Sequence, residues 1–277
     1  MNPYLIDLDI PTRISFSGGR TSAYMLYKIY EANGGIPDNC YVCFANTGKE
    51  RIETLDFVHA IECDLNIKIY WLEWVANKKR WMEVNYATAS IRGEPFQAMN
   101  RYKGILPIAI GRSCTVDLKI QVLDRFMQDT IGRKTPFQTF VGIRYDEPRR
   151  WRAEGETPNK WCENYLPLRH AKVTEPMVMD YWADMDFDLQ INQGEGNCDL
   201  CFLKSTNKIM SMLQEVPELA DWWIKQEEFQ AKRNDIKPQS KVFRIDRPSY
   251  KELKRIATEQ CSFNFSDEES LPCHCHD

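Results

Sequence analysis

Residues 12–30 read TRISFSGGRTSAYMLYKIY, and this stretch decides the fold class. Residues 12–16 predict a short β-strand. In residues 21–32, apolar and aromatic side chains recur every three or four positions, which predicts an amphipathic helix. The pair Gly34-Gly35 ends that helix. A strand that leads through a glycine turn into a helix is typical of α/β folds with a parallel sheet.

The turn itself, residues 17–22, has the composition of an anion-binding loop. Gly18 and Gly19 let the backbone approach an anion with no Cβ in the way. The following helix presents unpaired N–H groups and a positive dipole end, to which Arg20 adds charge. The spacing is neither that of a Walker A loop nor that of the dinucleotide-binding motif. A plain turn between strand and helix stays the alternative.

The rest of the first half continues the alternation of strands and helices. Strands are predicted at 41–45, 68–72 and 138–141, and helices at 51–65 and 114–131. This order predicts an α/β fold with a doubly wound, mainly parallel five-stranded sheet.

The second half is expected to be helical. Helices are predicted at 174–185, 204–215, 217–232 and 249–260, whereas 73–112 is less regular. We expect a nucleotide-binding α/β domain at 1–190 and a helical, cysteine-bearing C-terminal extension at 191–277.

Composition narrows the functional classes. The chain has 277 residues, 43% hydrophobic content and a net charge of −4, so its overall charge does not favour nucleic acid, although a local basic groove stays open. No signal peptide and no apolar run of about 20 residues is present, which favours a cytoplasmic protein without a membrane partner. Ten cysteines in a reducing compartment do not indicate disulfides. We expect Cys40, Cys43, Cys63 and Cys162 to be packed thiols.

Five segments in one order resemble the phosphoadenosine phosphosulfate (PAPS) reductase-like family of the PP-loop adenine nucleotide α-hydrolase superfamily. Together they span roughly residues 12–230. They are SGGRTS at 17–22, NTGKERIET at 46–54, GIRYDEPRR at 142–150, YLPL at 165–168 and GNCDLCF at 196–202.

The resemblance implies an enzyme that binds ATP or a sulfonucleotide (PAPS or APS) at the carboxyl edge of the sheet. It implies that Arg20, Lys49 and Arg144 neutralise phosphates and act in catalysis. Related enzymes that cleave ATP often have Asp at the position of Thr21, so the nucleotide and a magnesium contact stay open. The full set of nucleotide-binding residues implied by the resemblance is Ser15, Ser17, Gly18, Gly19, Arg20, Thr21, Ser22, Phe44, Asn46, Thr47, Gly48, Gly142 and Arg144.

The cysteines suggest a metal centre. Cys198 and Cys201 form a Cys-x-x-Cys pair, and Cys114 opens a predicted helix, where the dipole favours thiolate. The resemblance to the iron–sulfur branch of the family implies a [4Fe–4S] cluster on these three thiolates, and we favour Cys275 as the fourth ligand. A zinc site and an unligated pair stay open.

The C-terminal tail has a second interpretation. PAPS reductases end in a Glu-Cys-Gly-x-His motif whose cysteine attacks sulfur, and residues 272–276, PCHCH, keep only a Cys-x-x-His spacing. On this interpretation Cys275 is a candidate catalytic residue.

The leading hypothesis is an iron–sulfur PP-loop ATP pyrophosphatase that adenylates an acceptor, tRNA or DNA, before a sulfur donor displaces AMP. One alternative is a sulfonucleotide reductase that releases sulfite and takes electrons from a thioredoxin-like protein. Another is a nucleotide-binding regulatory protein without catalysis. The basic segment 149–152, RRWR, fits phosphates of a nucleotide or of a nucleic acid. An oligomer stays open.

Overall fold

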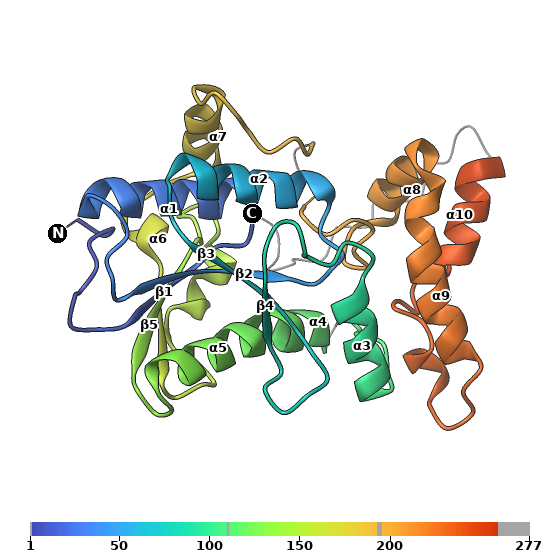
Figure 1. Ribbon diagram of the computed structural model, residues 1–277. Helices are drawn as coiled ribbons and strands as arrows, with labels where there is room; N and C mark the ends of the chain where they lie inside the picture. The colour runs from blue at the N-terminus through green and yellow to red at the C-terminus, as the bar shows by residue number, and fades with distance from the viewer. Residues whose placement is uncertain (1, 110, 193–195, 260–277) are drawn as a thin grey trace.

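A seven-stranded sheet forms the centre of the computed structural model, which describes residues 2–109, 111–192 and 196–259. The strand order is β4-β3-β2-β1-β5-β7-β6 (Figure 1). The five inner strands run parallel: β1 (Thr12–Ser15), β2 (Cys40–Asn46), β3 (Ile69–Glu73), β5 (Phe137–Val141) and β7 (Cys162–Tyr165). The antiparallel edge strands are β4 (Met82–Val84) and β6 (Gly155–Glu156).

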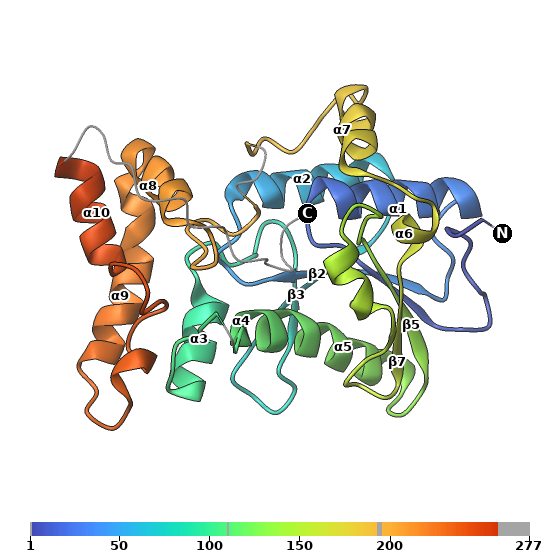
Figure 2. The same ribbon diagram turned by 180° about the vertical axis from the view of Figure 1, so that it is seen from behind.

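Helices cover both faces of this sheet, which confirms the predicted doubly wound α/β fold. Helices α1 (Arg20–Asn33) and α2 (Ile52–Asp64) lie on one face, and α5 (Gln121–Ile131) lies on the other (Figures 1 and 2). Two hydrophobic clusters, one for each face, fill the layers between sheet and helices. The number of strands is seven rather than five, because the edge strands β4 and β6 extend the parallel set.

The helix predicted at 114–131 is interrupted. It begins as α4 (Ser113–Thr115), continues as a π-helical turn, η1 (Val116–Ile120), and becomes α5. The smaller helices around the sheet are α3 (Glu94–Lys103), η2 (Pro148–Ala153), α6 (Pro167–His170) and α7 (Glu175–Ala183).

Three helices form the C-terminal part, and they lie next to α3, beyond the carboxyl end of β2 (Figure 1). They are α8 (Thr206–Glu215), α9 (Ala220–Ala231) and α10 (Tyr250–Glu259), with 3₁₀ turns η3 (Pro217–Leu219) and η4 (Pro238–Ser240). Trp223 packs in the core, where it is fully buried against Phe96 and Tyr250. No helix among the described residues has the length and apolar character to cross a membrane.

Candidate nucleotide and thiol site

The predicted phosphate loop lies where β1 ends and α1 begins, at the carboxyl edge of the parallel strands. Open α/β sheets bind ligands at this edge. The hydroxyl of Ser22 accepts from the backbone N–H of Ser17 at 3.2 Å, and the two hydroxyl oxygens are 2.9 Å apart. Gly19 is the N-cap of α1, and no side chain caps it. The positive end of this helix therefore faces the loop without a side-chain acceptor at its cap.

Two glycines make the loop possible. Gly18 has a φ of +82°, and a Cβ there would lie 2.7 Å from Thr54 Cγ2 and 3.1 Å from a ring carbon of Phe44. Gly142, just after β5, brings its backbone so near the loop that a Cβ would lie 3.1 Å from the Cα of Ser22. Gly142 therefore lies next to the loop that holds Gly18 and Ser22, an arrangement that the resemblance implies.

All three predicted phosphate cations are paired with carboxylates, and for Arg20 and Lys49 the partner lies in segment 188–199. The guanidinium of Arg20 donates to both oxygens of Asp188, at 2.7 and 2.8 Å. The ammonium of Lys49 lies 2.5 Å from Asp199 and is largely buried. The structure therefore gives each cation a partner within the chain, and phosphate binding by either one stays a prediction.

The third cation, Arg144, reaches the loop directly. Its guanidinium donates to the Thr21 hydroxyl at 2.8 Å and to Asp146 at 3.0 Å. The predicted basic segment, now η2, folds over it, and Trp151 Nε1 donates to the Arg144 carbonyl at 3.1 Å. The side chain of Arg144 therefore connects segment 142–150, which follows β5, to the phosphate loop.

The second motif, at the end of β2, is braced by its own side chains. Asn46 Oδ1 accepts from Gly48 N–H at 3.0 Å. Glu50 accepts from the N–H and the hydroxyl of Thr47 at 2.8 and 2.7 Å, and its other oxygen lies 3.2 Å from Lys119 Nζ. This rigid turn presents residues 46–50 at the same sheet edge as the phosphate loop.

Two further predicted contacts lie deeper. Phe44 is completely buried in the core against Trp71, with ring centroids 5.0 Å apart. Ser15 is the last residue of β1 and is half-buried. An adenine ring near these positions stays a prediction.

The Cys-x-x-Cys segment joins this edge through the backbone. Segment 197–199 pairs antiparallel with segment 49–51 in a bridge between Cys198 and Glu50. Two backbone hydrogen bonds flank the bridge. The N–H of Arg51 donates to the carbonyl of Asn197 at 2.8 Å, and the N–H of Asp199 donates to the carbonyl of Lys49 at 2.9 Å. The sequence motifs at 17–22, 46–54, 142–150 and 196–202 therefore lie together at one edge of the sheet.

In this segment Cys201 is buried and Cys198 is half-buried. Burial raises the pKa of Cys198 well above its usual value, and the nearby Cys201, Glu50 and Asp199 raise it further. Cys114 packs against the same hydrophobic cluster. A protonated thiol is a poor metal ligand and nucleophile, so a metal bound at Cys198 would have to displace its proton.

The predicted cluster stays a prediction. Within residues 2–109, 111–192 and 196–259, no three or more His, Cys, Asp or Glu side chains form a group able to hold a metal ion. Cys275 lies outside the described residues. The described thiols do not by themselves fit a cluster.

Of the cysteines predicted to be packed, Cys43 and Cys162 are buried and Cys40 is half-buried. The prediction is wrong for Cys63, which is exposed near the end of α2 because it falls on the solvent side of that helix. The hydroxyl of Thr139 lies 3.2 Å from Cys162 Sγ.

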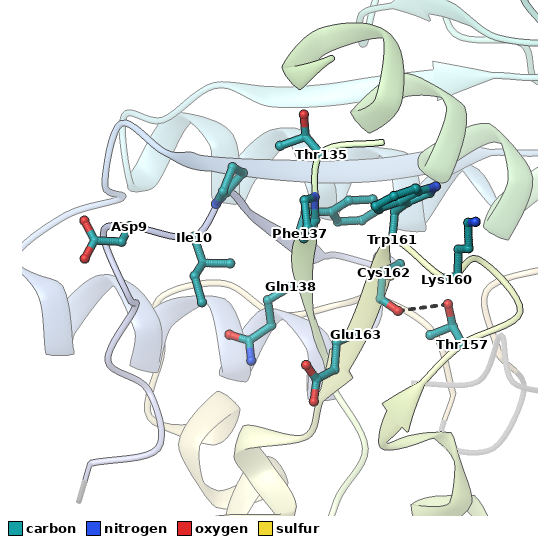
Figure 3. A pocket seen from close by; sticks show the side chains of 12 residues that line it. Asp9, Ile10, Thr135, Phe137, Gln138, Thr157, Lys160, Trp161, Cys162 and Glu163 are labelled. Carbon is teal, nitrogen blue, oxygen red and sulfur yellow. Dashed lines mark hydrogen bonds between the residues drawn. The ribbon is translucent and has the colours of Figure 1, made fainter. Parts of the chain in front are cut away.

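A pocket of about 600 Å³ lies at the opposite, amino edge of the sheet (Figure 3). Phe137, Trp161 and Cys162 line it at the starts of β5 and β7, with Lys160 at its rim. Its volume is in the range of small-molecule sites. None of the residues predicted to bind nucleotide or metal lines this pocket.

Sequence reasoning missed several residues that hold the site together. Asp188, Asp199 and Glu50 neutralise its cations, and Asn197 contacts the phosphate loop. Asn197 and Asp199 sit within the quoted motif 196–202, so their position beside Cys198 was the available signal. Asp188 has no comparable signal.

A comparison with curated proteins identifies a phage relative. The chain is 31% identical over 204 residues to an uncharacterised nin region protein, ORF290, of Escherichia phage lambda, covering 71% of this chain and 67% of that protein. The chain belongs to the family of this phage protein. No known family model matches it.

Among solved structures, the chain is similar to phosphoadenylyl-sulfate (PAPS) reductase from Candida auris in its phosphate complex. The TM-score is 0.38 and the identity 14%, over 62% of this chain and 71% of that one. The fold is therefore assigned from the strand order and the connections described above, and not from this similarity.

Proposed function

We propose that this chain is a PP-loop enzyme that binds the phosphates of an adenine nucleotide in the loop at 17–22. The observation that carries the proposal is the turn at Gly18, which only glycine fits, placed at the uncapped N-terminus of α1. Such a helix end offers N–H donors to an anion. The guanidinium of Arg144, donating to Thr21, supplies positive charge beside it.

The reaction that we propose is adenylation followed by sulfur transfer. An acceptor oxygen attacks the α-phosphorus of ATP, the α–β bridging bond breaks, and pyrophosphate leaves with its electron pair. The terminal sulfur of a persulfide donor then displaces AMP and leaves donor and acceptor joined by a disulfide. A second thiol of the donor cleaves that disulfide, which releases the thiolated acceptor and leaves the donor oxidised to a disulfide. We propose tRNA or DNA as the acceptor, a magnesium ion with the ATP, and the cytoplasm as the place of action.

The protein's contribution would be electrostatic. The loop N–H groups and Arg144 would stabilise the negative charge of the leaving pyrophosphate. Arg144 is paired with Asp146 but already donates to Thr21 of the loop. Arg20 and Lys49 would reach the phosphates only by leaving Asp188 and Asp199, so we place these two in a supporting role. We also propose a [4Fe–4S] cluster, with a zinc site as the alternative. Quantitation of iron, sulfide and zinc after anaerobic purification distinguishes the two.

The proposal is tested by binding first and turnover second. Calorimetry should detect ATP and pyrophosphate binding to the purified full chain. Labelled pyrophosphate should then be released from ATP when tRNA or DNA is added. Binding of neither ligand would refute the nucleotide site, and binding without pyrophosphate release under any acceptor would refute the adenylation chemistry.

A second candidate is reduction of a sulfonucleotide. The bridge between Cys198 and Glu50 favours it, because it brings a thiol pair to the edge that carries the phosphate loop. A dithiol of the thioredoxin class would supply two electrons, cleaving the sulfur–oxygen bond to give sulfite, the nucleotide and a disulfide. Sulfite release from PAPS or APS distinguishes this reaction, and binding without either turnover indicates a regulatory protein.

A further inference from the structure

Asn197 connects the thiol segment to the phosphate loop. Its side chain is 2% exposed. The side-chain Nδ2 donates to the carbonyl oxygen of Ser17 at 2.9 Å. Its own carbonyl accepts from the N–H of Arg51 at 2.8 Å, so the donor is held in place by the backbone.

This contact fixes the direction of the next N–H group in the loop. The peptide that joins Ser17 to Gly18 is planar and trans, so its C=O and its N–H point in opposite directions. Because Asn197 holds the oxygen on one side, the Gly18 N–H is directed to the other side. A peptide next to glycine otherwise rotates easily, since there is no Cβ to restrict it.

The loop does not hold this orientation through Gly18 alone. The plane of the Ser17–Gly18 peptide turns about ψ of Ser17 and φ of Gly18, which is +82° here, and the hydrogen bond from Asn197 to the Ser17 oxygen restrains both rotations. Asn197 therefore acts on the part of the loop that carries the first N–H of the glycine pair.

We propose that Asn197 is a positioning residue that presets the Gly18 N–H for a phosphate oxygen without itself touching the ligand. This inference rests on the proposed function, since it assumes that the loop binds phosphates. On this proposal, Asn197 belongs both to the Cys-x-x-Cys segment and to the phosphate site, because its side chain holds the Ser17 carbonyl.

The test compares pyrophosphate with adenosine in calorimetry on the full chain. Asn197→Ala should raise the Kd for pyrophosphate about tenfold, the effect of one lost hydrogen bond. The Kd for adenosine should not change, because adenosine has no phosphate. The matched control is Asn39→Ala, which removes an asparagine that also donates to backbone carbonyls, at the opposite edge of the sheet.

The outcomes separate the inference from the proposed function. If the wild-type chain binds no pyrophosphate, both fail. If wild type binds and Asn197→Ala binds equally well, or if adenosine binding weakens as much, the positioning role alone is refuted.

If Asn197→Ala does not fold, a measurement on the wild-type chain still tests the proposal. In a nitrogen-15 NMR titration, pyrophosphate should shift the Gly18 amide resonance. Pyrophosphate binding without any shift of that resonance would overturn the proposal.

Discussion

Gly18 is the residue on which the phosphate loop depends most. We expect Gly18→Ala to abolish ATP binding and to lower stability by about 1–3 kcal/mol, because its Cβ would lie 2.7 Å from Thr54 Cγ2 at positive φ. Calorimetry with ATP and urea unfolding measure the two effects.

The matched control is Gly34→Ala, at the other end of α1. Gly34 has a φ of +67°, and a Cβ there meets nothing within 4 Å. It should share the backbone strain but keep ATP binding. Loss of ATP binding in both variants would show that strain in α1, and not the loop, is responsible.

Residue identity predicted the position of the loop glycines better than it predicted the ion pairs around them. Gly18 and Gly142 were expected at the site, and both have the close approaches that require glycine. The partner of Arg20 is 168 positions away, and no local pattern in a single sequence points to Asp188. Ion pairs of this kind depend on how the chain folds back.

Between elements, the buried ion pair of Arg13 and Asp124 joins β1 to α5. The two atoms are 2.7 Å apart, and the side chains are 5% and 14% exposed. Asp124→Ala should cost about 3–5 kcal/mol of unfolding free energy, because it leaves the Arg13 charge buried without its partner. Urea unfolding measures this.

The comparison variant for this pair is Glu31→Ala, which breaks the more exposed pair with Lys28. It should cost less than about 1 kcal/mol. Equal losses in the two variants would contradict the importance that we assign to burial.

Glu227 on α9 gives a prediction about pH. It accepts from the N–H groups of Phe243 and Tyr250, at 3.3 and 3.0 Å, and so ties α9 to α10. Burial is the main cause that raises its pKa. The folded state therefore keeps its proton to higher pH than the unfolded state.

The sign follows from this difference. Stability contributed by protonated Glu227 is fully present below the unfolded pKa, near 4.5, and is lost as pH rises through the raised folded pKa. Glu227→Gln should flatten that decline in urea unfolding at a series of pH values. Glu228→Gln, exposed and adjacent, should leave the wild-type slope, and an unchanged slope in Glu227→Gln would contradict the prediction.

Periodicity located most elements but not all of them. The helix predicted at 51–65 is observed at Ile52–Asp64. Strand β7 escaped notice because Glu163 and Asn164 are polar, and the strand is specified by pairing with β5 rather than by apolar residues. The π-helical turn η1 adds a residue to one turn, which a search for helical spacing does not detect.

At the scale of the whole molecule, one hydrophobic cluster runs from the sheet into the C-terminal helices. It includes Phe96 and Leu118 from the first part and Trp223 and Tyr250 from the second. The predicted division at residue 190 therefore does not separate two hydrophobic cores.

A chain that ends at residue 190 should consequently fail to fold as a soluble monomer. It would expose the apolar surface that α8, α9 and α10 cover, and it would leave Lys49 without Asp199. Size-exclusion chromatography and circular dichroism measure this. A monomeric, cooperatively unfolding fragment would show that the first part has a sufficient core of its own.

The two ends of the sheet also govern how copies of the molecule behave at high concentration. One edge is the three-residue β4 and the other is the two-residue β6. A neighbouring copy that approaches either edge finds few backbone groups with which to extend the ladder. The five parallel strands, which are longer and would be better templates for intermolecular sheet extension, are covered on both sides by these short edge strands.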